Sequence, residues 1–230
     1  METRSTDSVS GLNSVHESIL TSIRKSLAAS APFDAVHKKH HSENIAADGP
    51  INRQTIPRAT LIDNFRKNLE AVGGHCTIVS SETEAAEAVR SILQKSTARR
   101  VAVSDSPLVK SVVGENNEGE IVVNAPVEYL FESDMGITGA QWAIAETGTL
   151  VLESNAERHR LTSLVPPVHI CVLKAETIRQ TLGEVLELVH DNLSRTVTFI
   201  TGASRTSDIE LTLAIGVHGP GELHVIVIDY

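Results

Sequence analysis

Short apolar blocks and amphipathic blocks alternate along the chain from about residue 59 onward. Apolar residues at helical spacing predict helices over 59–72, 82–95, 107–113, 177–190 and from about residue 207. Runs rich in Val and Ile predict strands at 77–79, 100–103, 121–123, 168–173, 197–201 and 223–228, with a strand pair over 140–152. This alternation predicts an open α/β sheet with helices on both faces.

The first 58 residues follow a different pattern. Residues 14–29 carry an apolar residue at every fourth position, which predicts an amphipathic helix. Residues 30–57 contain Pro, Gly and the run His37–His41, and they predict a long loop. That run lacks the spacing of a defined metal site, so a solvated loop is the favoured interpretation. We therefore predict an N-terminal helical extension and linker over 1–58, followed by one domain over 59–230.

The composition indicates a folded protein. With 230 residues, 41% of them hydrophobic, the chain can bury a sizeable core. The formal net charge of −9 disfavours general binding to nucleic acid or to anionic membranes. No apolar run approaches the roughly 20 residues needed to cross a bilayer. The N-terminal residues lack the apolar core of a secretory signal, which predicts a cytoplasmic location.

The chain contains two cysteines, Cys76 and Cys171, each within a predicted apolar strand. Both are interpreted as small core residues rather than catalytic thiols. An iron–sulfur cluster usually needs about four cysteine ligands, so this chain cannot carry one alone.

A first polar cluster interrupts the strand pair over 140–152, at Glu146, Thr147, Gly148 and Thr149. A buried carboxylate is costly unless it is paired, hydrogen-bonded or in contact with a ligand. Glu146 is therefore a candidate base, nucleophile or ligand-binding acceptor. Gly148 lets the backbone approach a ligand closely, and the two hydroxyls can bind an anion or hold the carboxylate. A hairpin turn with an exposed glutamate explains the same residues, and both interpretations stay open.

A second cluster, Thr201–Glu210, leaves one predicted strand and enters the helix predicted from about Ser207. Ser207 and Glu210 fit the S-x-x-E capping box at the start of a helix. Such junctions also present backbone N–H groups to anions, and an arginine can add a carboxylate or phosphate clamp. The two interpretations are compatible. The candidate ligand-binding residues of this cluster are Ser204, Arg205, Thr206 and Asp208.

A third cluster, Gly216–Gly221, frames His218 with glycines before the last predicted strand. Its glycine spacing is GxxGxG, not the dinucleotide-binding GxGxxG, and the sequence contains neither a GxxxxGK[ST] phosphate loop nor a GxSxG elbow. His218 is a candidate for proton transfer and Gly219 for ligand contact, against a loop without a role. His169, at the start of a strand, is interpreted as structural.

With these residues in view, the sequence resembles the LutC/YkgG family, whose members consist largely of a LUD (lactate-utilisation) domain. The resemblance runs from about residue 59 to the C-terminus, and Ala203 stands where proline is expected in many relatives. It rests on four ordered motifs: Gly139-Ala140 with Ala143–Leu152, Leu164–Ile170, Thr201–Glu210 and Gly216–Pro220.

The resemblance implies a NagB/RpiA/CoA-transferase-like fold. It also implies a role in oxidising L-lactate to pyruvate with two companions, a cysteine-rich protein and an iron–sulfur ferredoxin-like protein. On this hypothesis the chain binds no cofactor alone, and the iron–sulfur clusters belong to the partners. A small-molecule anion, lactate or a phosphate-bearing molecule, is the expected ligand.

Two other classes of function compete with this hypothesis. One is a stand-alone enzyme similar to CoA-transferases or sugar-phosphate isomerases, in which Glu146 acts as nucleophile or base. The other is a regulatory ligand-binding module without chemistry.

Overall fold

The computed structural model describes residues 20–22, 24–25, 56–114, 119–155, 160–190, 194–207 and 213–230, without the side chains of residues 206, 207, 213 and 214. The chain divides into two units, Met1–Gln54 and Thr55–Tyr230. In the first unit, residues 20–22 and 24–25 are helical, within the helix predicted over 14–29. His37–His41 lies outside the described residues. The predicted boundary at residue 58 stays a prediction.

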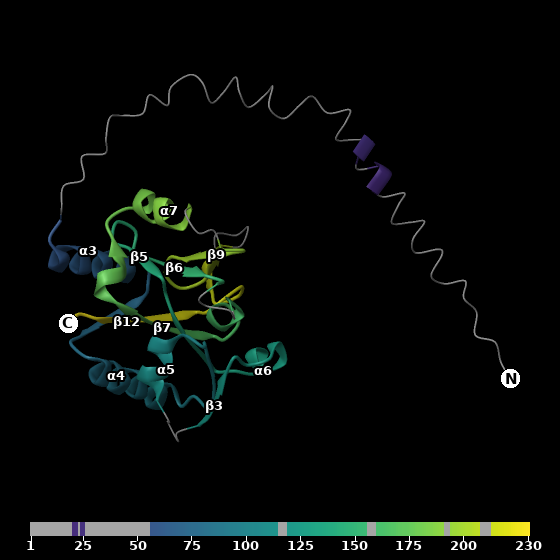
Figure 1. Ribbon diagram of the computed structural model, residues 1–230. Helices are drawn as coiled ribbons and strands as arrows, with labels where there is room; N and C mark the ends of the chain where they lie inside the picture. The colour runs from purple at the N-terminus through teal and green to yellow at the C-terminus, as the bar shows by residue number, and fades with distance from the viewer. Residues whose placement is uncertain are drawn as a thin grey trace, which may run out of the picture. The chain divides into compact units, whose positions relative to one another are not determined.

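The second unit is built on a six-stranded sheet in which every pair of neighbouring strands is parallel (Figure 1). The strand order is β1-β12-β7-β4-β2-β3. This arrangement confirms the predicted α/β class with an open sheet. The strands are β1 (His75–Val79), β2 (Arg100–Val103), β3 (Glu120–Val123), β4 (Met135–Gly139), β7 (Val168–Lys174) and β12 (Glu222–Ile228).

One face of this sheet is covered by α4 (Glu82–Ser96) and α5 (Pro107–Val113). Helix α4 begins at Ser81, whose hydroxyl accepts the N–H of Glu84, while the Glu84 carboxylate accepts the N–H of Ser80. These reciprocal bonds satisfy backbone donors that the first helical turn leaves unpaired. The apolar side of α4 then packs on alternate residues of the central strands.

The other face carries a second layer of mixed structure. Helix α3 (Arg58–Ala71) packs there beside a four-stranded sheet with the order β8-β5-β6-β9. Helix α7 (Leu182–His190) covers the far side of this smaller sheet, and α6 (Val127–Phe131) packs near β2 (Figure 1). The remaining elements are β5 (Trp142–Ile144), β6 (Thr149–Glu153), β8 (Ile178–Arg179), β9 (Val197–Ile200), β10 (Arg205–Ser207), β11 (Leu213–Ile215) and the 3-10 turns Arg160–Ser163 and Ala175–Thr177.

Two predicted helices differ from the observed structure. The helix expected over 177–190 begins at Leu182, because Ile178–Arg179 pairs with β5 and the Thr181 hydroxyl accepts the N–H of Glu184. The helix expected from about Ser207 is wrong at its start, since Ser207 ends β10 and pairs with Leu213 of β11. The four-residue capping motif is a local signal, and strand pairing overrides it. Residues 208–212 lie outside the described residues.

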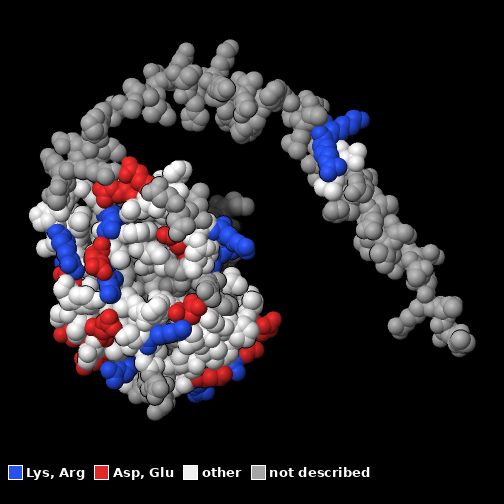
Figure 2. Space-filling model, viewed as in Figure 1, with Lys and Arg blue, Asp and Glu red and all other residues white. Residues whose placement is uncertain are grey.

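Charges of both signs are interspersed over the described surface on the face shown in Figure 2. Among the described residues, no helix has both the length and the apolar character needed to cross a membrane.

The turn between β5 and β6 lies against the backbone of α3. Gly148 has φ +66°, and a Cβ added to it would lie 2.2 Å from the backbone nitrogen of Leu69. The Asn68 amide donates to the carbonyl oxygen of Ala145 over 2.7 Å, which ties the same turn to the same helix. The glycine is therefore required by close packing of hairpin on helix as well as by its backbone angle.

Glu146 extends from this turn toward the start of α7. Its Oε1 accepts the backbone N–H of Leu182 over 2.7 Å, and its own N–H donates to the carbonyl oxygen of Gln180. The residue is exposed. The carboxylate thus satisfies one of the free donors at the start of a helix, where negative charge is also favourable.

We expect Gly148→Ala to destabilise the protein by about 2–4 kcal/mol, because it adds a left-handed backbone penalty to overpacking against α3. Urea denaturation measures this change. The matched control is Gly183→Ala in α7, where the nearest atom to an added Cβ is the Thr181 hydroxyl at 3.8 Å. That control should keep or raise stability. Equal stability of the two variants would show that the hairpin can move away from α3 without lowering the free energy of unfolding.

We expect Glu146→Ala to lower stability by about 0.5–1 kcal/mol through loss of the acceptor at the start of α7. Glu146→Gln retains a carbonyl oxygen at the same position and should cost less than the alanine variant. Amide hydrogen exchange at Leu182 reports the contact directly and should accelerate in the alanine variant alone. Unchanged exchange in that variant would remove the capping role.

Candidate functional site

Three of the sequence motifs converge on one cavity of about 310 Å³, here called the motif pocket. It lies at the amino ends of β7 and β12, between the end of β9, the loop that follows it and the loop before β12. Its lining combines residues 199–205 and 218–220 with Ser163, Leu164, His169 and Leu223.

Backbone hydrogen bonds hold the two loops of the motif pocket together. The N–H of Ser204 donates to the carbonyl oxygen of Pro220 over 2.8 Å, and the N–H of Gly216 donates to the carbonyl oxygen of Ser204 over 3.0 Å. Gly219 faces the Ser204 side chain, so that an added Cβ would lie 3.3 Å from the serine Cβ. The predicted ligand-binding residues Ser204 and Gly219 therefore share one wall.

The 201–205 loop also lies on the carboxyl end of α3. At Gly202, φ is +79° and an added Cβ would lie 2.4 Å from the carbonyl oxygen of Val72. Arg205 donates from Nη2 to that same oxygen over 2.7 Å. A guanidinium at the negative end of a helix is electrostatically favourable. The contact shown for Arg205 is thus structural, and its role as an anion clamp stays a prediction.

His169 contributes a buried imidazole to this pocket. Its Nε2 lies 2.8 Å from the Thr138 hydroxyl oxygen on the neighbouring strand. Its Nδ1 is buried and has no hydrogen-bond partner within the described part of the chain. Burial lowers the pKa of His169 to about 3, so the ring is neutral at physiological pH. A buried ring nitrogen without a partner is costly and needs an explanation.

His218 lies on the exposed loop before β12 and lines the same pocket. A histidine there is within reach of both a ligand and solvent. The pocket therefore combines an exposed imidazole with a buried one.

A row of threonine hydroxyls joins the first polar cluster to the motif pocket. Thr149 Oγ1 lies 2.7 Å from both Thr147 Oγ1 and Thr201 Oγ1. Thr201 and Phe199 line the motif pocket and also a neighbouring, more apolar cavity of about 400 Å³. That second cavity is lined in addition by Ile144, Thr147, Thr149, Leu182 and Leu186.

The first polar cluster is therefore divided between two roles. Thr147 and Thr149 line the second cavity, whereas Glu146 and Gly148 line neither cavity and contact α7 and α3. A catalytic role for Glu146 stays a prediction. Of the remaining candidates, Thr206 lies in β10 with its side chain outside the described residues, and Asp208 lies outside them altogether.

Sequence reasoning missed the partnership of His169 with Thr138. Thr138 belongs to β4, whose sequence MGITG contains two glycines and was not predicted as a strand. The available signal was the polar histidine inside an otherwise apolar strand, because buried polar groups need partners. Within the described residues, no group of three or more His, Cys, Asp or Glu side chains is placed to hold a metal ion.

Comparisons with known proteins agree with this architecture. The LUD domain model matches residues 127–228. The chain is 44% identical over 102 residues to lactate utilization protein C of Deinococcus radiodurans, covering 43% of this chain and 48% of that protein. It is 30% identical over 161 residues to lactate utilization protein C of Halalkalibacterium halodurans, covering 62% of this chain and 68% of that protein.

The chain thus spans about half the length of some curated relatives that it matches. A crystal structure of a DUF162 family protein from Deinococcus radiodurans has a TM-score of 0.59 and 28% identity, covering 75% of this chain and 99% of that one. The motifs that line the pocket fall within or beside the matched LUD region. The chain belongs to the LutC/YkgG family of LUD-domain lactate-utilisation proteins.

Proposed function

We propose that this chain acts in the oxidation of L-lactate to pyruvate, as a subunit that binds a small anion and leaves electron transfer to partner proteins. The partners are a cysteine-rich protein and an iron–sulfur ferredoxin-like protein. Relatives named lactate utilization protein C support the link to lactate. The observation that carries the proposal is the convergence of three motifs on one pocket, which is also lined by the buried His169.

The motif pocket suits a small polar ligand. Its volume of about 310 Å³ lies at the lower end of the range for small-molecule sites and exceeds the size of a three-carbon acid. The Thr201 and Ser204 side chains contribute hydroxyl groups to its lining, and the buried His169 ring is neutral. Such groups orient a hydroxyl-bearing carboxylate in a partly dry site, where each bond is stronger than in water.

Proton transfer is the chemical step that this pocket can support. Oxidation of lactate to pyruvate removes two electrons and two protons from the hydroxyl-bearing carbon and its hydroxyl group. We assign the hydroxyl proton to His218, which lines the pocket and is exposed to solvent. Glu146 is disfavoured for this step, and for a CoA-transferase-like nucleophile, because its carboxylate is bound to the N–H of Leu182 outside the cavity.

The electrons are assigned to the partners because the two cysteines are unsuited to hold a cluster. Cys76 and Cys171 both pair with Val225, on opposite sides of β12. They therefore lie two strands apart, about 10 Å, which also precludes a disulfide without backbone movement. Cys171 is fully buried, and burial raises the pKa of Cys76 to about 12, whereas metal ligation requires a thiolate.

Co-purification tests the proposed assembly. The tagged chain, expressed with the genes that neighbour its own, should retain cysteine-rich partners and iron with sulfide, whereas the chain alone should retain neither metal nor sulfide. Lactate-dependent reduction of an artificial acceptor should require the assembly. Stoichiometric iron and sulfide in the isolated chain would contradict the division of roles.

We expect His218→Asn to lower lactate oxidation by the reconstituted assembly at least about tenfold, as for loss of a general base. Stability should change by less than about 0.5 kcal/mol, because the residue lies on an exposed loop. The matched control is His190→Asn at the exposed end of α7, which should leave the rate unchanged. Equal rates for the two variants would remove His218 from the mechanism.

A further inference from the structure

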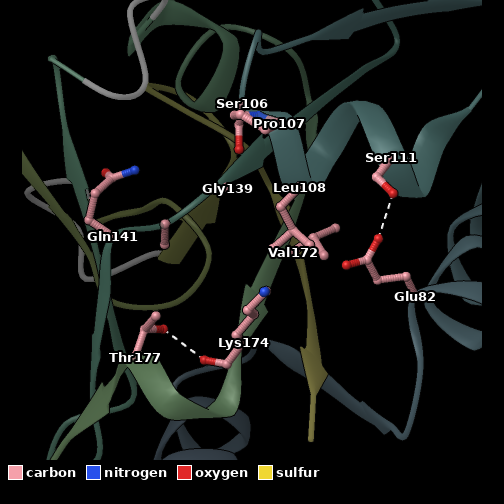
Figure 3. Close-up of a pocket in the computed structure, with 11 residues that line it drawn as sticks. Glu82, Ser106, Pro107, Leu108, Ser111, Gly139, Gln141, Val172, Lys174 and Thr177 are labelled. Atoms are coloured by element: carbon pink, nitrogen blue, oxygen red, sulfur yellow. Dashed lines mark hydrogen bonds between the residues drawn. The ribbon is translucent and has the colours of Figure 1, made fainter. Parts of the chain in front are cut away.

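A separate cavity of about 490 Å³ lies beyond the carboxyl ends of the strands of the six-stranded sheet, opposite to the motif pocket (Figure 3). It shares no lining residue with the motif pocket. Its lining includes the polar side chains of Glu82, Ser106, Ser111, Gln141, Lys174 and Thr177, together with an apolar wall that includes Leu108 and Val172. We call it the switch-point cavity, for the topology that creates it.

The connections that follow β2 and β4 run in opposite directions along the sheet at this cavity. From the carboxyl end of β2 the chain passes through α5 to β3 on one side, whereas from the end of the adjacent β4 it continues to β7 on the other side. Open α/β sheets bind ligands where neighbouring connections diverge in this way, since the divergence leaves a crevice beyond the strand ends. Residues following β2 and residues following β4 face each other across the cavity.

Two hydrogen-bond donors are oriented toward this crevice. Gln141 Oε1 accepts the backbone N–H of Glu153 over 2.6 Å, which leaves the amide NH₂ directed to the cavity (Figure 3). Ser106 occupies the N-cap position of α5, yet its hydroxyl makes no capping bond to the helix and instead points into the cavity (Figure 3). Serine at this position normally bonds to its own helix, so its orientation here needs another explanation.

Opposite charges line two sides of the same space. The Lys174 ammonium projects into the cavity, and its hydrogen bond with Tyr230 raises the pKa of this lysine, which keeps it cationic. Across the cavity, one oxygen of Glu82 accepts the Ser111 hydroxyl and the other faces the open space (Figure 3). The cavity therefore offers donors and a cation on one side and an acceptor on the other.

We propose that the switch-point cavity binds an organic anion that carries a hydroxyl group. Lys174, Gln141 and Ser106 bind the carboxylate or phosphate, Glu82 accepts the hydroxyl, and the apolar wall contacts the carbon skeleton. The charge-assisted bonds are the strong ones, and the glutamate discriminates between hydroxylated and plain acids. The proposal is independent of the motif pocket and of the lactate-utilisation role.

Isothermal titration of the full chain with two matched pairs of probes tests this site. L-lactate is compared with propionate, and glycerol 3-phosphate with n-propyl phosphate, so that one pair reports a carboxylate and the other a phosphate. The hydroxylated member of at least one pair should bind about tenfold more tightly than its partner. Glu82→Gln should abolish that preference while it retains the bond with Ser111.

Two further variants test the anion side. Lys174→Met removes the charge, and Gln141→Glu retains the acceptor for Glu153 while replacing the donor by a carboxylate oxygen; each should weaken binding at least about tenfold. Lys110→Met removes an exposed charge from α5 outside the cavity lining and should leave affinity unchanged.

Three outcomes would overturn the proposal. The first is that no probe binds. The second is affinity that stays the same in folded Lys174→Met and Gln141→Glu protein. The third is equal affinity for both members of each pair, which would indicate a simple anion site.

Discussion

The close contact between the β5–β6 hairpin and α3 is the constraint on which the second layer depends. A single missing side chain, at Gly148, lets the hairpin reach the backbone at Leu69. One turn further along the same helix, Gly202 and Arg205 reach the carbonyl oxygen of Val72. Helix α3 therefore supports both the hairpin and the loop that lines the motif pocket. Moving either the hairpin or the loop away from α3 would separate Thr149 from Thr201. The packing on this one helix therefore determines the geometry of the site.

The two ends of the six-stranded sheet present different chemistry. At the amino ends of β7 and β12, histidines and hydroxyls line a pocket without fixed charge beyond Arg205, which contacts α3. At the carboxyl ends, Lys174 and Glu82 place opposite charges around a larger cavity. The difference follows from sheet structure. In a parallel sheet, loops connect to the strands at both the amino and the carboxyl ends. Each end therefore contains residues from segments that are distant in sequence.

Hydrophobic periodicity was sufficient to predict the fold class and most elements, because burial on both faces imposes nearly continuous apolar strands such as β7 and β12. It failed at β4, which lies at the centre of the sheet. Gly136 of that strand cannot carry a side chain, since an added Cβ would lie 1.9 Å from the carbonyl oxygen of Thr162. Strand propensity reflects side-chain packing, so the two glycines of β4 weaken the apolar signal that Met135 and Ile137 provide.

The candidate site was also predictable only in part. The loops carrying Ser204 and His218 were each identified as a candidate cluster by their glycines and polar residues, and backbone bonds bring the two loops together. The cluster at 146–149 could not be divided from sequence, since Glu146 and Thr149 are polar residues three positions apart at one turn. They differ in the segment that each one contacts: the exposed carboxylate accepts the N–H of Leu182 at the start of α7, and the buried threonine contacts the Thr201 hydroxyl beside a cavity. Such a distinction depends on contacts between segments more than 30 residues apart, and local residue patterns do not contain it.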